Sequence, residues 1–284
     1  MKGIKFFLLS VLCGFLLTGC PGDDPENDRE ILINFSAIPL SDMVLKSTAT
    51  TNESLVSKML LIGVDDKNVP VKIYPVISNP ALTGMKLTMP LEVKTLYAIA
   101  NPSSGMESAT PSTFSDLSNL TGDFSTAPQS PFLMGGKGDI VGSSATIELI
   151  RAVAKIEVIA PNELEIESVT VKNTPNKAYV FKKDTRVAPT NSVRVDYLVN
   201  TVTTTVYVAE CSKDNPVELE VIGMYLGQEA KYTIRLNDNG APIDIARNTH
   251  YQVNITPLSN VESNVSITIP AWDDVRTDDH MIPK

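Results

Sequence analysis

The clearest strand pattern in the chain lies near its middle, at residues 145–158 (ATIELIRAVAKIEV). Successive side chains of a strand point to opposite faces, and here Ile147 and Leu149 place apolar groups on one face. Beyond them the apolar positions change parity: Ala152, Ala154, Ile156 and Val158. The register therefore slips by one residue between Ile150 and Arg151, as at a β-bulge, which bends a strand and increases its twist. We predict one long, bent strand that is shared by two packed sheets.

Short apolar runs that are typical of strands recur on both sides of this stretch. They cover residues 31–38, 59–64, 69–76, 85–93, 96–100, 165–173, 178–181, 194–198, 202–208, 217–221, 229–236, 251–255 and 265–269. Asn239-Gly240 predicts a tight hairpin turn, whereas residues 41–57 and 103–130 are polar and turn-prone and indicate surface loops. Three apolar residues of the second loop have helical spacing and predict one short helix over the sheet: Phe114, Leu117 and Leu120.

Many short strands, with no long helical period between them, are typical of β-sandwiches. The chain has 284 residues, of which 43% are apolar and 20% charged, and this balance indicates a globular protein with a real core. Pro161-Asn162 marks a break between two groups of strands. We therefore predict an all-β chain with two β-sandwich domains in tandem, at residues 31–160 and 161–284.

The N-terminus has the pattern of a secretory signal at residues 1–19. Lys2 and Lys5 precede an apolar run at 6–17, which is shorter than the roughly 20 residues that span a bilayer as a helix. Leu17-Thr18-Gly19-Cys20 resembles a bacterial lipobox, and the sequence therefore predicts lipidation of Cys20. The alternative is a non-lipidated signal with an incidental cysteine.

Residues 20–30 then form a lipidated tether, which is acidic and contains proline and glycine. Its residues Asp23, Asp24 and Glu26 resemble the export signal of Bacteroidetes surface lipoproteins. Acyl chains on Cys20 would hold the protein to the outer membrane, since each buried methylene contributes about 0.8 kcal/mol. The expected location is the cell surface.

The net charge indicates which partners are disfavoured, and the cysteine content indicates whether disulfides can stabilise the fold. Loss of Lys2 and Lys5 with the signal takes the formal charge from −9 to −11 at pH 7, which disfavours nucleic acid and anionic lipid as partners. Cys13 lies in the signal and Cys20 is the predicted lipid site, so that Cys211 is the one cysteine of the folded body. No intramolecular disulfide is expected, and the core must hold the fold.

Catalytic and metal-binding patterns are weak. Cys211 with His250 is conceivable as a dyad, but an inert, packed thiol is the more ordinary interpretation. Gly135-Gly136-Lys137-Gly138 lacks the spacing of a phosphate-binding loop, and a turn is favoured instead. The acidic C-terminal residues have no regular calcium-loop spacing and indicate a solvated tail: Asp273, Asp274, Asp278, Asp279 and His280. We predict no enzyme, no cofactor and no metal site.

Several stretches together resemble the Bacteroidales fimbrillin superfamily, the subunits of type V pili. Arg151-Ala152-Val153-Ala154-Lys155-Ile156 is similar to the central strand motif of that family. Further stretches are similar to its other motifs: Tyr97-Ala98-Ile99-Ala100-Asn101, Phe132-Leu133-Met134-Gly135, Arg247-Asn248 with Tyr251-Gln252-Val253, and residues 265–269 with Pro270-Ala271-Trp272. The resemblance implies two β-sandwiches of Greek-key, transthyretin-like type.

The resemblance also implies assembly by donor-strand exchange. In stalk fimbrillins an extracellular trypsin-like or gingipain-like protease removes the first strand after a basic residue, and a C-terminal strand of another pilin subunit fills the groove. On this chain the removable strand carries Ile31, Ile33, Phe35 and Ala37. The candidate cleavage site is Lys46-Ser47, where a lysine replaces the usual arginine. The donor strand carries three alternate apolar residues: Val265, Ile267 and Ile269.

Three functions follow in order of preference. The first is a structural stalk subunit of a cell-surface pilus, which loses its first strand and joins a fimbria. The second is an anchor, tip or accessory subunit that retains both the strand and its lipid. The third is a surface lipoprotein that binds glycans or host protein, which calls for exposed aromatic side chains in loops; Phe114 and Phe124 are the aromatic residues of the long loop.

Overall fold

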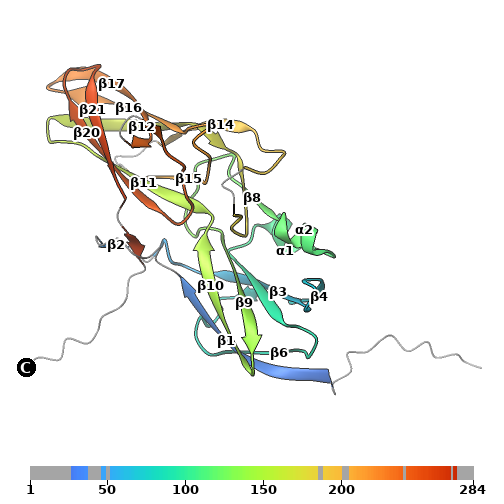
Figure 1. Cartoon of the computed structure of the whole chain (residues 1–284). Helices are drawn as coiled ribbons and strands as arrows, with labels where there is room; N and C mark the ends of the chain where they lie inside the picture. Colours follow the sequence, from blue (N-terminus) through green and yellow to red (C-terminus); the bar gives the residue numbers. More distant parts are fainter. Residues whose placement is uncertain are drawn as a thin grey trace, which may run out of the picture.

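The computed structural model describes residues 27–37, 46–48, 52–184, 188–199, 205–238, 241–269 and 271–273. Strands dominate these residues and form an N-terminal part, low in Figure 1, and a C-terminal part above it. The two helices, α1 (Ser104–Glu107) and α2 (Phe114–Ser118), are short. No helix of the described residues has the length and apolar character needed to cross a membrane. The prediction of an all-β chain is confirmed.

An eight-stranded sheet, here called the N-terminal sheet, has the order β4-β3-β7-β9-β10-β1-β6, with β5 paired to β3. Its strands are β1 (Asp28–Ala37), β3 (Lys58–Val64), β4 (Pro70–Ile73), β5 (Ile77–Ser78), β6 (Met85–Pro90), β7 (Thr95–Ala100), β9 (Met134–Val141) and β10 (Ser144–Arg151). Strands from both ends of this order contribute to one buried cluster that includes Ile33, Leu61, Met89 and Ile147. The sheet therefore curls around its core.

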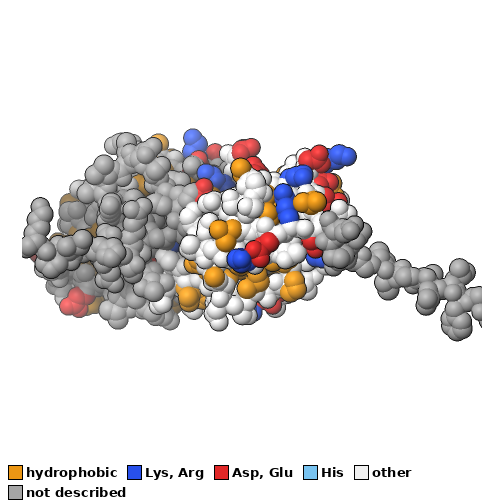
Figure 2. All heavy atoms as spheres, turned by 90° about the horizontal axis from the view of Figure 1, so that it is seen from below, with side chains coloured by type: hydrophobic (Ala, Val, Ile, Leu, Met, Phe, Trp, Pro, Cys, Tyr) orange, Lys and Arg blue, Asp and Glu red, His pale blue; other side chains and the backbone are white. Residues whose placement is uncertain are grey.

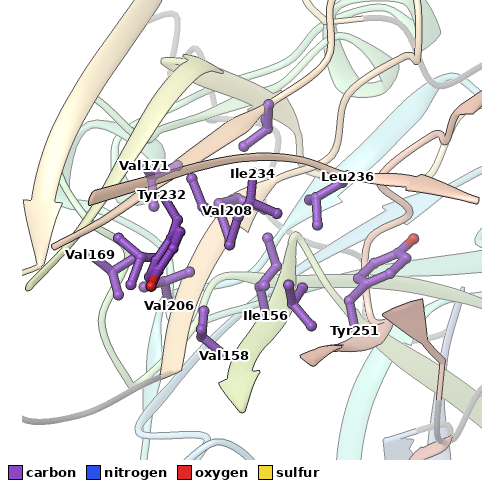
Figure 3. Close-up of a cluster of buried hydrophobic side chains, with 14 of the residues drawn as sticks. Ile156, Val158, Val169, Val171, Val206, Val208, Tyr232, Ile234, Leu236 and Tyr251 are labelled. Atoms are coloured by element: carbon purple, nitrogen blue, oxygen red, sulfur yellow. The ribbon is translucent and has the colours of Figure 1, made fainter. Parts of the chain in front are cut away.

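Two four-stranded sheets form the second part, here called the C-terminal sandwich, with the orders β15-β11-β20-β21 and β14-β12-β16-β17. Their strands are β11 (Val153–Ile159), β12 (Leu164–Pro175), β14 (Arg194–Val199), β15 (Thr205–Ala209), β16 (Glu218–Tyr225), β17 (Gln228–Arg235), β20 (His250–Pro257) and β21 (Ser263–Thr268). Figure 3 shows side chains of both sheets meeting between them, among them Ile156 from β11, Val171 from β12 and Tyr232 from β17. This interdigitation is the ordinary way in which a β-sandwich buries its inner faces.

The predicted strands all overlap strands of the structure, but the single bent strand at 145–158 is wrong. The stretch forms two strands, β10 and β11, with Ala152 between them. β10 pairs with β9 and β1 in the N-terminal sheet, whereas β11 pairs with β15 and β20 in the sandwich. Ala152 is fully buried, and its N–H donates to Leu133 O at 2.9 Å instead of to a neighbouring strand. The segment does pass from one sheet to another, as expected, but through a break.

The expected turn at Gly135-Gly136-Lys137-Gly138 is also wrong, because these residues lie inside β9. Close packing explains the glycines. A Cβ atom at Gly135 would lie 2.4 Å from Val180 O, and one at Gly136 would lie 1.9 Å from Glu148 O. Glycine is therefore required by close approach of other backbone, not by a turn.

The predicted helix and hairpin are confirmed. In α2, Leu117 is fully buried, and Thr113 and Asp116 form a reciprocal capping box at its start. β18 (Asn237–Asp238) and β19 (Ala241–Pro242) pair antiparallel on either side of residues 239–240, which lie outside the described residues.

A buried cluster of charged and polar groups ties the two parts together where β10 gives way to β11. Arg151 is fully buried, and its Nε donates to Glu53 O at 3.0 Å while its Nη1 donates to Asn248 Oδ1 at 2.8 Å. Lys155 Nζ lies 3.0 Å from Glu53 Oε1, and the Tyr207 hydroxyl donates to the same oxygen at 2.5 Å. Burial, followed by the hydrogen bond to Glu53, raises the pKa of Tyr207. Glu53 therefore has partners from three strands.

Further contacts cross the same junction. β8 (Thr121–Asp123) pairs antiparallel with β13 (Lys177–Tyr179). A second buried arginine, Arg247, donates to the carbonyl oxygens of Tyr179 and Val180 and pairs with Glu210. On the coloured part of the face seen from below in Figure 2, side chains of both charges lie interspersed with apolar ones.

Replacement of Ile33 in β1 tests the core that this strand completes. Ile33 is fully buried, so Ile33→Ala removes apolar contacts and should lower the free energy of unfolding by about 2–5 kcal/mol. The neighbouring Leu32 is 40% exposed, and Leu32→Ala should cost less than about 1 kcal/mol. Denaturant unfolding followed by circular dichroism measures both. Equal losses for the two variants would contradict the inward orientation of Ile33.

Replacement of Glu53 tests the buried cluster. Glu53→Gln leaves Lys155 buried beside a neutral side chain, and removing one partner of a buried ion pair costs about 3–5 kcal/mol. The matched control is Glu107→Gln, which breaks the pair of Lys58 and Glu107 at the surface and should cost less than about 1 kcal/mol. The same unfolding assay applies. A Glu53→Gln variant as stable as the control variant would show that the cluster does not hold the junction.

Candidate assembly site

The strand predicted to be removable, β1, lies inside the N-terminal sheet and not at its edge. It pairs parallel with β10, from Leu32 opposite Ser144 onward, and antiparallel with β6, up to Ile33 opposite Met85. Ile31 and Ile33 are fully buried, and Phe35 is 9% exposed. The fourth predicted residue, Ala37, ends the strand. β1 thus occupies a slot between β10 and β6, and its alternate apolar side chains Ile31 and Ile33 fill the core there.

The connection from β1 to β3 contains the candidate cleavage site. Its central residues were expected to form an exposed loop, but Lys46 and Ser47 belong to a short strand, β2 (Lys46–Thr48). β2 pairs parallel with β22 (Ala271–Asp273), with Lys46 opposite Ala271. The expectation of a plain loop is therefore wrong at these residues, because the C-terminal end of the chain supplies a pairing partner. The sequence from residue 38 to residue 57 contains this one lysine and no arginine.

The predicted donor strand, β21, lies at the edge of one sheet of the sandwich. It pairs antiparallel with β20, with Val265 opposite Ile255 and Ile267 opposite Val253. Val265 and Ile267 are half-buried against the core of the sandwich. Ile269 lies just beyond the strand and is 53% exposed. In this structure the strand covers the core of its own chain, and its role as a donor to another subunit stays a prediction.

Cys211 and His250, the imagined dyad, are both buried and have structural surroundings. Cys211 is 1% exposed within the sandwich core, and burial raises the pKa of its thiol, which disfavours the reactive thiolate. His250 is fully buried, and burial together with nearby Lys155 lowers the pKa of its imidazole. Its Nε2 lies 3.1 Å from Glu157 Oε2. These surroundings favour the interpretation of Cys211 as a packed thiol.

Metal and lipid sites are the remaining expectations. Within the described ranges, no group of three or more histidine, cysteine, aspartate or glutamate residues is placed to hold a metal ion. The acidic tail from Asp274 to His280 lies outside those ranges, as do the predicted signal and Cys20. Lipidation of Cys20 therefore stays a prediction from the sequence.

Sequence reasoning missed the buried charges at the junction, although part of the signal was present. Arg151 has the same parity as Ile147 and Leu149, which places it on the inward face of β10. An arginine at an inward position of an apolar strand indicates a buried partner. Glu53 gave no such signal, because it lies in a polar segment with no periodicity. Its position beside Arg151 and Lys155 fixes the chain just before β3 begins.

Solved structures of surface proteins share this fold. A cell adhesion protein from Bacteroides eggerthii matches with a TM-score of 0.62 at 14% identity, covering 88% of this chain and 98% of that one. The tip fimbrial protein Mfa3 from Porphyromonas gingivalis, with a C-terminal truncation, gives 0.60 at 15% identity, covering 86% of this chain and 100% of that one. A cell adhesion protein from Bacteroides uniformis gives 0.55 at 12% identity, covering 88% and 100%. At these identities the likeness shows the fold alone.

Sequence comparison gives the family. No curated protein matches the chain. The family model described as "Fimbrillin-A associated anchor proteins Mfa1 and Mfa2" matches residues 73–278, which is more than two thirds of the chain and includes β10 and the whole sandwich. This match confirms the resemblance to fimbrillins and the prediction that the protein is not an enzyme. The chain belongs to the family of fimbrillin-A associated anchor proteins Mfa1 and Mfa2, which are fimbria-associated proteins of the cell surface.

Proposed function

We propose that the chain is an anchor- or tip-type subunit of a type V pilus, exported as a lipoprotein on Cys20, and that it keeps β1 in its slot. The observation that carries this proposal is the pairing of β1 with β6 over Asp28–Ile33 and with β10 over Leu32–Ala37, together with a connection whose one basic residue lies in a paired strand. Ile31 and Ile33 complete the core of the N-terminal sheet. Lys46, the one basic residue from 38 to 57, lies in a strand paired with β22.

A stalk role, which the sequence put first, requires the loss of β1. Proteases bind their substrates as extended segments and need access to the backbone at the cleaved bond. Pairing with β22 occupies one edge of the backbone at Lys46 and Ser47. The family description, which names anchor proteins, also favours the second interpretation of the sequence over the first.

A retained β1 restricts how the chain joins other subunits. With the slot between β10 and β6 filled, the chain accepts no donor strand there. It can still offer an edge strand such as β21, whose outward residues Asn264 and Ser266 are exposed. A subunit that donates without accepting occupies one end of a polymer, and this is the position of an anchor or a tip.

The N-terminus of the protein on the cell surface distinguishes the two roles. We expect mass spectrometry of outer-membrane protein to show a chain that begins with an acylated Cys20, because the connection is not cut. A chain that begins at Ser47 would overturn the proposal and restore the stalk role. Lys46→Ala is the matched variant: it should leave the acylated N-terminus at Cys20 and the surface amount unchanged, whereas a cleaved stalk subunit would accumulate uncut.

Removal of the lipid site tests the attachment to the membrane. Each buried methylene of an acyl chain contributes about 0.8 kcal/mol, so Cys20→Ala should move the protein from the outer-membrane fraction to the soluble fractions. Cys211→Ala is the control, since the thiol of Cys211 is buried and distant in sequence from the tether. Immunoblots of membrane and soluble fractions measure both. A Cys20→Ala protein that stays in the membrane fraction would refute lipid anchoring at this residue.

A further inference from the structure

An open cavity of about 520 Å³ lies on the outer face of the N-terminal sheet. Its floor is made by outward-facing residues of three neighbouring strands: Tyr97 of β7, Lys137 of β9, and Glu148 and Ile150 of β10. One wall is α2, through Phe114 and Ser118, and the other is the chain from Phe181 to Asp184. We propose that this cavity binds a sugar ring of a carbohydrate ligand.

The cavity exists because the segments that pack on the outer face of the N-terminal sheet cover β3 and β7 but do not reach β10. Over β3 and β7, the outer face is buried under α1, α2 and the chain at Val180 and Phe181. Gly135 allows that chain to lie close to β9, since a Cβ there would meet Val180 O at 2.4 Å. Beyond it nothing of the described chain covers Glu148 and Ile150, which stay half-exposed. Volumes between about 300 and 1,000 Å³ are typical of small-molecule sites.

Phe114 provides an exposed aromatic surface at this cavity, which two largely buried rings, Tyr97 and Phe181, also line. Phe181 and Tyr97 pack edge to face with centroids 5.0 Å apart, and this contact fixes both rings. Phe114, the first residue of α2, is 45% exposed although Leu117 of the same helix is fully buried. An exposed phenylalanine beside a cavity can cover the apolar C–H face of a sugar ring, and this burial is the main apolar contribution that such ligands offer.

Charged groups of both signs surround the same space and have no ion-pair partner among the described residues. They are two lysines and two carboxylates: Lys137, Lys182, Glu148 and Asp184. Lys137 Nζ lies 5.9 Å from the ring centroid of Tyr97. Lys183 differs, because its Nζ donates to Asn119 Oδ1 at 3.2 Å and lies over the ring of Tyr179. Ammonium groups donate hydrogen bonds and carboxylates accept them.

A carbohydrate fits this combination better than other small ligands. Its hydroxyl groups accept from lysines and donate to carboxylates, while its ring has an apolar face for Phe114. An anionic ligand would be repelled by the carboxylates of Glu148 and Asp184. An apolar ligand would remove water from four charged groups without offering them hydrogen bonds, which costs free energy. The inference needs neither lipidation nor retention of β1, and it stands apart from the proposed position in the pilus.

Binding is tested with the mature chain carrying Cys20→Ser and a panel of methyl glycosides of neutral hexoses and N-acetylhexosamines. Saturation-transfer NMR finds binders and calorimetric titration gives their Kd. We expect saturable binding of at least one glycoside, weakened about tenfold or more by Phe114→Ala, the loss of roughly 1.4 kcal/mol or more. Glu148→Gln should weaken the same binder, because the carboxylate accepts from a sugar hydroxyl. Thermal melting confirms that each variant folds.

The control variant is Leu198→Ala, which truncates a side chain of similar exposure (49%) at a different cavity and should leave Kd unchanged. The proposal is overturned if no glycoside of the panel binds saturably. It is equally overturned if Phe114→Ala and Glu148→Gln bind as tightly as the parent chain, since binding would then lie elsewhere. Either failure leaves the N-terminal test of the pilus role untouched, so the two proposals fail separately.

Discussion

The pairing of β1 on both of its edges is the constraint on which the N-terminal sheet depends. Its backbone meets β10 on one side and β6 on the other, and Ile31 and Ile33 reach the core. Loss of the strand would leave two rows of backbone groups and an apolar surface without partners, and unpaired buried polar groups are costly. The slot must therefore be filled by some strand, and the question for function is which chain supplies it.

β10 connects the pairing of β1 to the junction between the two parts of the chain. This strand is the parallel partner of β1, and its last residue, Arg151, binds the backbone of Glu53. Lys155, four residues further on in β11, pairs with the carboxylate of the same glutamate. One continuous stretch of chain thus contacts both ends of the connection, since β1 precedes the connection and Glu53 lies near its end. The stretch from Arg151 to Ile156, which resembles a fimbrillin motif, thus joins the N-terminal sheet to the sandwich.

The sequence predicts what depends on local alternation and misses what depends on distant partners. The inward-facing residues of β1 were predicted from the alternation of apolar side chains along the strand, and the burial of Leu117 was predicted from helical spacing. Each pattern is contained in its own segment of the chain. The glycines of β9 were misread as a turn, since they are required by backbone outside their own segment: Val180 at Gly135 and Glu148 at Gly136. β2 was missed for the same reason, because its partner β22 lies at the opposite end of the chain. The cavity beside Phe114 likewise needed the whole sheet to be seen.

In the proposed role, an end subunit would differ from a stalk subunit in the connection after β1. A strand that is covalently attached to its own chain has a higher effective concentration at the slot than a free donor strand. β1 therefore stays bound in the slot for as long as the covalent link is intact. The link persists if no protease can cut it. Here the connection has no arginine, and its one lysine pairs with the C-terminal end of the chain. In the proposed role, an end subunit therefore needs no new architecture; it needs the stalk fold with a connection that is protected.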